Sequence, residues 1–296
     1  MFTGCGTALV TPFQQDGLLD EPALRALVER QITAGINFLC PCGTTGESPT
    51  LSHAEHMRVV EITVQQARGR VPVLAGAGGY DTTHVIKLIA DLHKLGVDGI
   101  LSVTPYYNKP TQEGLFQHYR ALADSTPLPI IVYSVQPRTA VNVDPATLVR
   151  LSEIRNIIGV KEASGSVSQM ASILARVPES FVVLSGDDAV ALPLIALGGH
   201  GVISVVSNEI PAEFTSLTQA ALKGDFVHAR QLQKKYQALM EVNFVETSPG
   251  PVKFAMARMG LCEPIWRLPM VPPALASQQK IEAVLEALGL LAGVRA

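Results

Sequence analysis

Short runs of consecutive apolar residues alternate with longer amphipathic segments along most of this chain. The apolar runs are continuous, which is typical of strands that are covered on both faces of a parallel sheet. The predicted strands span residues 6–10, 38–42, 71–75, 99–103, 130–133, 157–161, 181–185 and 201–205.

The segments between these strands carry signals for helix starts. Asp20 can cap a helix that runs to about Ala34. The Ser52–Glu55 segment has the spacing of a capping box, which predicts a helix to about Ala67. Asp81 can cap a third helix. The pattern is therefore one of strand followed by helix, repeated.

Repeated strand–helix units in about 220 residues favour an α/β fold of the (β/α)8 TIM-barrel type over an open doubly wound sheet. After Asn208 the strand signals stop, and residues 211–296 predict helices with a proline-rich break at 268–273. We therefore expect a (β/α)8 catalytic barrel at 1–223 and a C-terminal helical domain at 224–296.

Composition and charge narrow the classes of partner. Apolar residues make up 47% and charged residues 17% of a chain with a formal net charge of −3 and no basic stripe, which argues against nucleic acid. Cys5, Cys40, Cys42 and Cys262 have no zinc-site or CxxC spacing, so we expect reduced, mostly buried thiols. Without a secretory-signal pattern or an apolar run of about 20 residues, we expect a cytoplasmic protein with no membrane partner.

Lys161 ends the apolar run of the sixth predicted strand. Burial disfavours the charged form of an amine, and a neutral lysine can form a Schiff base with a carbonyl compound. A lysine at a strand end, taken alone, more often extends its amine to solvent. The interpretation therefore depends on the residues around it.

The residues that follow the strands of such a barrel meet at one rim. The Gly43–Glu47 turn offers N–H groups and two hydroxyls to a small carboxylate, the phenol of Tyr133 can transfer protons, and Arg138 can clamp a carboxylate. Each alone is better explained as a tight turn, a core tyrosine or a solvated charge. Their convergence with Lys161 favours a catalytic site. The other rim segments are 104–108, 186–188 and Ile203.

The sequence contains no complete motif for binding a phosphate, a dinucleotide or a metal ion. No Gly-Lys-Ser/Thr follows the 43–47 turn, and Asp81 stands where a dinucleotide fingerprint needs its last glycine. His53 and His56 lack a third metal ligand with convincing spacing. We therefore predict neither a metal nor an organic cofactor.

From Phe2 to about Leu291 the chain resembles the dihydrodipicolinate synthase family of pyruvate-dependent class I aldolases. The motifs that carry the resemblance are Gly-Thr-Thr-Gly-Glu at 43–47, Thr-Pro-Tyr-Tyr-Asn at 104–108, Tyr133 with Arg138-Thr139, Gly-Val-Lys-Glu-Ala at 159–163, Leu-Ser-Gly-Asp-Asp at 184–188 and Gly-Gly-His-Gly-Val-Ile-Ser at 198–204.

This resemblance implies that Lys161 condenses with pyruvate and that the resulting enamine attacks L-aspartate 4-semialdehyde. It implies proton transfer by Tyr133, linked through Thr45 to Tyr107, which in relatives comes from a neighbouring subunit. A homo-oligomer, a dimer or a dimer of dimers, is therefore expected. The implied substrate-binding groups are the backbone of Thr44 and Thr45 for the pyruvate carboxylate, Arg138 for the semialdehyde carboxylate, and Gly186 and the Ile203 carbonyl for the shape and polarity of the pocket.

The chain departs from the family pattern beside Arg138. Ser134 replaces an asparagine, Pro137 lies one position late, and Ala140 replaces a glycine. A displaced proline changes the backbone of its loop, so these departures bear on the identity of the aldehyde.

Lysine-inhibited relatives bind lysine at a subunit interface. Tyr80 and His84 replace an asparagine and a glutamate there, and the missing carboxylate predicts weak or absent inhibition by lysine. The positions that match this regulatory site are Ser48, His53, His56, Tyr80, His84 and Tyr106.

Two alternatives remain beside the synthase. One is a related aldolase that cleaves N-acetylneuraminate, 2-keto-3-deoxygluconate or a hydroxy-oxo-acid, and Arg138 disfavours it. The other is a non-catalytic barrel that binds a 2-oxo acid, and a complete set of lysine, tyrosine and threonine argues against it.

Overall fold

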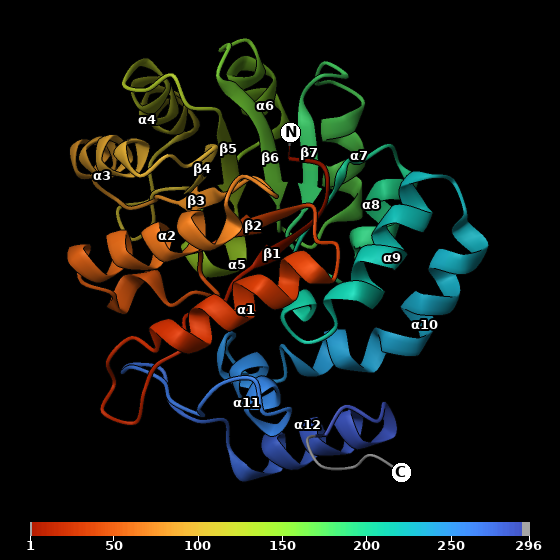
Figure 1. The fold of residues 1–296 in the computed structure, drawn as a ribbon. Helices are drawn as coiled ribbons and strands as arrows, with labels where there is room; N and C mark the ends of the chain where they lie inside the picture. The colour runs from red at the N-terminus through yellow and green to blue at the C-terminus, as the bar shows by residue number, and fades with distance from the viewer. Residues whose placement is uncertain (1, 292–296) are drawn as a thin grey trace.

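The computed structural model describes residues 2–291, and within them eight parallel strands form a barrel surrounded by helices (Figure 1). The strands are β1 (Gly4–Ala8), β2 (Phe38–Cys40), β3 (Leu74–Gly76), β4 (Gly99–Val103), β5 (Ile130–Ser134), β6 (Ile157–Glu162), β7 (Val182–Ser185) and β8 (Gly201–Ser204). Their order is β2-β1-β8-β7-β6-β5-β4-β3. A parallel bridge between Leu39 and Val73 joins the two outer strands and closes the barrel. The predicted (β/α)8 fold is confirmed.

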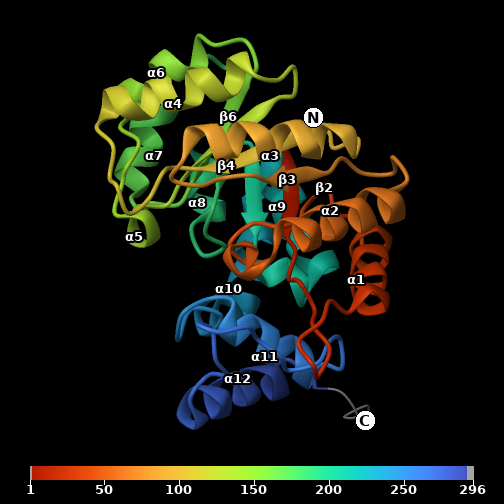
Figure 2. The same ribbon diagram turned by 90° about the vertical axis from the view of Figure 1, so that its left-hand side faces the viewer.

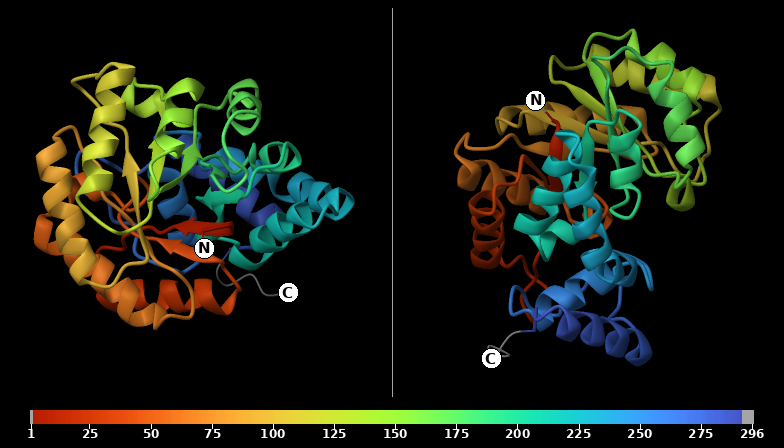
Figure 3. Two further views of the ribbon diagram at one scale, coloured as in Figure 1. Left: turned by 90° about the horizontal axis from the view of Figure 1, so that it is seen from above. Right: turned by 90° about the vertical axis from the view of Figure 1, so that its right-hand side faces the viewer.

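Helices cover the outside of the barrel, as the view along its axis shows (Figure 3). They are α1 (Glu21–Thr33), α2 (His53–Ala67), α3 (Thr82–Lys94), α4 (Gln112–Asp124), α5 (Gln136–Thr139), α6 (Pro145–Ser152), α7 (Val167–Leu174), α8 (Ala191–Ala196) and α9 (Pro211–Leu222), with 3-10 turns η1 (Ser48–Thr50) and η2 (Val206–Asn208). The three predicted N-caps are confirmed: Asp20, Ser52 and Asp81 each accept a hydrogen bond from the first turn of the helix that follows.

Side chains fill the amino end of the barrel. The rings of Phe2 and Phe38 meet edge to face with centroids 5.5 Å apart, and both side chains are fully buried. A Cβ atom at Gly6 would lie 2.1 Å from the Phe38 ring, and one at Gly99 would lie 2.7 Å from the Phe2 ring. Glycine on β1 and β4 therefore makes the space for this aromatic plug, and the opposite end remains for a site.

Of the predicted strands only 99–103 has the observed bounds, and the two largest differences at a strand start are in the first and the third. The first begins at Gly4 rather than residue 6, because Gly4 and Gly201 pair so closely that a Cβ at Gly201 would lie 2.0 Å from the Gly4 carbonyl oxygen. The third begins at Leu74 rather than residue 71, because Pro72 has no N–H for the ladder. The pattern of hydrophobic residues indicates neither the close pairing of Gly4 with Gly201 nor the missing N–H of Pro72.

The last helices are α10 (Phe226–Val242), α11 (Gly250–Arg258) and α12 (Leu275–Ala287). Helices α11 and α12 lie beyond the carboxyl ends of the strands, and α10 runs toward them from beside α9 (Figures 1 and 2). The proline-rich segment at 268–273 contains no helix, as predicted. Helix α10 packs on α8 and α9 through a shared apolar cluster, and the domain boundary at residue 223 stays a prediction. No helix within residues 2–291 is long and apolar enough to cross a membrane.

Candidate active site

Lys161 and Tyr133 lie side by side at the carboxyl end of the barrel. They are register partners on β6 and β5, and the Lys161 Nζ lies 4.1 Å from the centroid of the Tyr133 ring. Only 5% of Lys161 and 6% of Tyr133 are exposed. Lys161 is thus not a strand-end lysine that extends to solvent. The structure brings together the predicted nucleophile and the predicted proton-transfer group.

Gly186, just after β7, packs against the lysine stem. A Cβ atom at this position would lie 2.6 Å from Ala163 Cβ and 3.0 Å from Lys161 Cε. Any larger residue would therefore displace the amine. Ile203, on β8, is fully buried among the apolar side chains inside the barrel.

The Gly43–Glu47 turn leaves backbone donors available. The Gly46 N–H donates to Gly43 O and the Glu47 N–H donates to Thr44 O, both at 3.1 Å. The N–H groups of Thr44 and Thr45 find no backbone acceptor within residues 2–291. Thr11 Oγ1 donates to Gly46 O at 2.7 Å and fixes the turn from the side of β1. Two free, neighbouring N–H groups form a suitable site for a carboxylate.

Arg138 lies on α5, the short helix after β5. Pro137 occupies the first turn of this helix, where a missing N–H breaks no hydrogen bond, so the displaced proline is accommodated. Ser134 is fully buried, and its Oγ accepts the Val143 N–H at 3.2 Å. Ala140 ends the helix in the left-handed conformation at φ 57°, which glycine adopts more readily than alanine.

A cleft of about 650 Å³ opens at this rim. It joins Thr44, Tyr133 and Arg138 to the candidate regulatory residues, all six of which line it: Ser48, His53, His56, Tyr80, His84 and Tyr106. Burial lowers the pKa of His56 to about 4, and its Nε2 lies 2.9 Å from Gly76 O. His56 is therefore a neutral wall of the cleft. The rings of Tyr80 and Tyr106 meet edge to face at 5.5 Å.

Tyr107 is the predicted site residue that a single chain does not bring into the site. Its side chain is 90% exposed, and its backbone is left-handed at φ 67°. Thr45, its predicted partner, is only 5% exposed. Because the Tyr107 phenol is exposed on the surface of the chain, it is accessible to a second copy of this protein.

Three residues with structural importance at this end had no predicted role. Asp188 Oδ2 accepts the N–H groups of Val205 and Val206 at 3.0 and 2.8 Å and so holds the end of β8. Burial raises the pKa of Asp188 to about 6. Glu47 forms a buried ion pair with Lys253. Asp188 and Glu47 lie in predicted motifs, whereas no local signal distinguishes Lys253.

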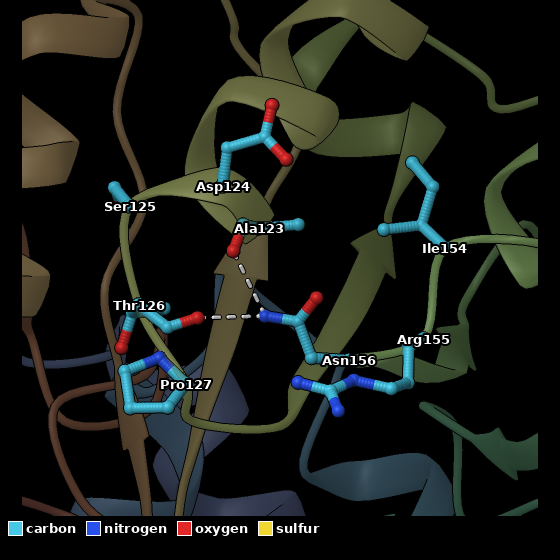
Figure 4. Close-up of a pocket in the computed structure, with 8 residues that line it drawn as sticks. All are labelled: Ala123, Asp124, Ser125, Thr126, Pro127, Ile154, Arg155 and Asn156. Carbon is cyan, nitrogen blue, oxygen red and sulfur yellow. Dashed lines mark hydrogen bonds between the residues drawn. The ribbon is translucent and has the colours of Figure 1, made fainter.

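A second hollow, of about 490 Å³, lies at the amino end between the segments that precede β5 and β6 (Figure 4). Asn156 donates from Nδ2 to the carbonyl oxygens of Ala123 and Thr126 at 3.0 and 2.8 Å. None of the predicted site residues lines it. Within residues 2–291, no group of three or more metal-ligating side chains could hold a metal ion.

A buried lysine beside a tyrosine at the carboxyl rim of a (β/α)8 barrel is the arrangement expected of a class I aldolase. A sequence model of the Dihydrodipicolinate synthetase family matches residues 1–288, and the chain belongs to this family.

Relatives from other organisms are similar to this chain over nearly its whole length. The 4-hydroxy-tetrahydrodipicolinate synthase of Koribacter versatilis (strain Ellin345) is 51% identical over 289 residues, which are 97% of this chain and 96% of that protein. The crystal structure of dihydrodipicolinate synthase from Aquifex aeolicus matches with a TM-score of 0.96 and 43% identity, covering 99% of this chain and 100% of its own. The chloride-inhibited enzyme from Acinetobacter baumannii, complexed with pyruvate, has a TM-score of 0.97 and 40% identity, covering 98% and 100%.

These comparisons confirm that the chain is an enzyme, a lyase of the class I aldolase type. They also support the synthase interpretation over the related aldolases and over a non-catalytic barrel.

Proposed function

We propose that this chain condenses pyruvate with L-aspartate 4-semialdehyde through a Schiff base on Lys161. The observation that carries the proposal is the buried Lys161 Nζ lying 4.1 Å from the Tyr133 ring centroid. The lysine amine attacks the ketone of pyruvate, and water leaves. The protonated imine draws electrons, so a methyl proton leaves and an enamine forms. The enamine carbon then attacks the aldehyde. The amine of the product closes the ring and displaces Lys161.

The other residues act on carboxylates and protons. The free N–H groups of Thr44 and Thr45 hold the carboxylate of pyruvate. Arg138 uses one N–H on Ser248 O, at 3.0 Å, and has others left for the carboxylate of the semialdehyde. Tyr133 donates and recovers protons at the Schiff base. Gly186 and Ile203 set the shape of the pocket.

The exposure of Tyr107 supports an oligomeric enzyme. We propose that Tyr107 enters the site of a neighbouring copy and joins Thr45 and Tyr133 in a proton relay, so the active unit is at least a dimer. We further propose a cytoplasmic location. Sedimentation of the protein at assay concentration tests the oligomer, and a fully active monomer would contradict it.

Reduction with borohydride in the presence of pyruvate tests the Schiff base. We expect a covalent adduct on Lys161 and none in Lys161→Ala, whose activity falls by at least about 10³-fold because the nucleophile is gone. Turnover with L-aspartate 4-semialdehyde is then compared with cleavage of N-acetylneuraminate, 2-keto-3-deoxygluconate and hydroxy-oxo-acids. An adduct without turnover of the semialdehyde would refute the substrate but not the chemistry.

The regulatory cleft supports weak or absent inhibition by lysine. Tyr80 and His84 line it in place of an amide and a carboxylate, so a lysine ammonium group loses its charged partner. We expect millimolar lysine to leave the rate nearly unchanged and His84→Glu to increase its effect. Inhibition of the unaltered enzyme by micromolar lysine would show that the cleft binds it through other groups.

A further inference from the structure

An ion pair between Lys253 and Glu47 joins α11 to the turn proposed to hold pyruvate. The Lys253 Nζ lies 2.6 Å from Glu47 Oε1, and the two side chains are 0% and 1% exposed. The residues are 206 positions apart in the chain. Burial lowers the pKa of Lys253, and the charge of Glu47 opposes this shift. A C-terminal helix thus reaches the catalytic rim through a fully enclosed contact.

The position of Glu47 determines the conformation of the 43–47 turn. It directly follows the Thr44-Thr45-Gly46 segment, and its backbone is left-handed at φ 52°. A non-glycine residue in this conformation needs surrounding contacts to keep it there. Its N–H closes the turn on Thr44 O, so a shift of Glu47 would move the donors proposed for the carboxylate.

The second oxygen of Glu47 is also held from the C-terminal segment. The Arg267 N–H donates to Glu47 Oε2 at 3.4 Å, and the Arg267 guanidinium binds Gly17 O at 2.7 Å. Both cations contact the buried ring of Phe13, whose centroid lies 4.4 Å from Lys253 Nζ and 4.3 Å from Arg267 Cζ. Glu47 is therefore fixed in position and not merely neutralised.

The segment that leads into α11 contacts Arg138, the residue proposed to bind the second carboxylate. Ser248, two residues before α11 begins, accepts the hydrogen bond from Arg138 Nη2. One short element of the C-terminal region thus contacts both the turn that follows β2 and the helix that follows β5. These are the two elements proposed to bind the two substrate carboxylates.

We propose that α11 is a brace for the active site, in which Lys253 acts through Glu47 as a positioning residue for the turn that binds pyruvate. A buried ion pair is weak evidence for stability, because apolar side chains of similar volume often stabilise as well. What the pair does provide is a fixed contact, with Lys253 Nζ 2.6 Å from Glu47 Oε1. The inference rests on the proposed function for the identity of the ligand, but not for the rigidity of the turn.

The test compares Lys253→Met, Glu47→Gln and the double variant with the full-length enzyme. The matched control is Arg258→Met, which removes another ion pair of α11, 2.9 Å long and half-exposed, with Glu282. Two quantities are measured for each: the KM for pyruvate beside kcat, and hydrogen exchange of the Gly46 and Glu47 amides without substrate.

We expect Lys253→Met to raise the KM for pyruvate by about tenfold or more and to speed exchange in the turn by a similar factor. The double variant should be no worse than the worse single variant, because both remove one contact. The control should stay within about twofold in both measurements. If Lys253→Met does not fold, Glu47→Gln, which keeps the volume, decides the same question.

A fall in melting temperature with unchanged KM and unchanged exchange would overturn the brace, since the pair would then be structural only. If Lys253→Met speeds amide exchange in the turn but the unaltered enzyme traps no pyruvate, the brace stands and the proposed function is refuted. If the unaltered enzyme traps pyruvate but Lys253→Met leaves amide exchange unchanged, the proposed function stands and the brace is refuted.

Discussion

The two ends of the barrel both carry a hollow, yet only one has the chemistry of an active site. At the carboxyl end the cleft contains Tyr133 and Arg138, and the N–H groups of Thr44 and Thr45 have no backbone acceptor in the described residues. At the amino end the side-chain amide of Asn156 already donates hydrogen bonds to two backbone carbonyl oxygens (Figure 4). Volume therefore does not identify the site; the meeting of Tyr133, Arg138 and the turn at 43–47 at the carboxyl end does.

The direction of the backbone adds to this difference. The amino-end hollow is lined by the residues that end α4 and follow it, where the helix presents carbonyl oxygens and the negative end of its dipole. The helix end disfavours a carboxylate, although Arg155 also lines this hollow. Parallel strands all point the other way, so the side chains that follow them converge on the carboxyl rim.

Glycine makes close packing possible at both ends, but for different purposes. Gly186 leaves space for the stem of Lys161, whereas Gly99 leaves space for the ring of Phe2. The same change, glycine to alanine, should therefore affect activity at one end and stability at the other.

Among exchanges between glycine and alanine, the largest effect is expected for Gly186→Ala. The added Cβ would meet Ala163 Cβ and Lys161 Cε, and the amine would shift by several tenths of an ångström or more. We expect kcat/KM to fall by about 10²-fold, because small misplacements of a nucleophile are costly. Steady-state kinetics and the rate of borohydride trapping measure it. An unchanged trapping rate would show that the lysine stem tolerates the methyl group.

A smaller effect, of a different kind, is expected for Gly99→Ala. The added Cβ would lie 2.7 Å from the Phe2 ring and 3.1 Å from Pro129 O. We expect a loss of about 1–3 kcal/mol in the free energy of unfolding, as is usual for overpacking. Chemical denaturation measures it, and kcat/KM of the folded enzyme should be unchanged. A specific loss of activity would break the contrast between the two ends.

The smallest effect is expected for Ala140→Gly. Ala140 holds a left-handed conformation at φ 57°, which glycine adopts without steric cost. We expect the protein to gain about 1 kcal/mol in stability. Because Arg138 keeps its helix, the KM for the semialdehyde should stay within about twofold. A large change in that KM would mean that the alanine helps to select the aldehyde.

Local patterns in the sequence were enough for the architecture and for the centre of the site. Continuous apolar runs and N-caps such as Ser52 are properties of neighbouring residues, so they predicted the barrel and the helix starts. The position of Lys161 at a strand end followed from the same pattern, and its family motif supplied the expected roles. Hydrophobicity alone does not predict the strand starts at Gly4 and Leu74, because the first depends on pairing with Gly201 and the second follows Pro72.

Only the tertiary structure decided which distant residues support that site. Lys253 reaches Glu47 across 206 residues, and Arg138 reaches Ser248 across 110. Nothing adjacent to these residues in the chain indicates their partners, because a contact of this kind is set by how α11 lies beneath the barrel. The exposure of Tyr107 is likewise a property of the folded surface. The sequence determined the reactive groups, and packing over long separations determined what holds them in place.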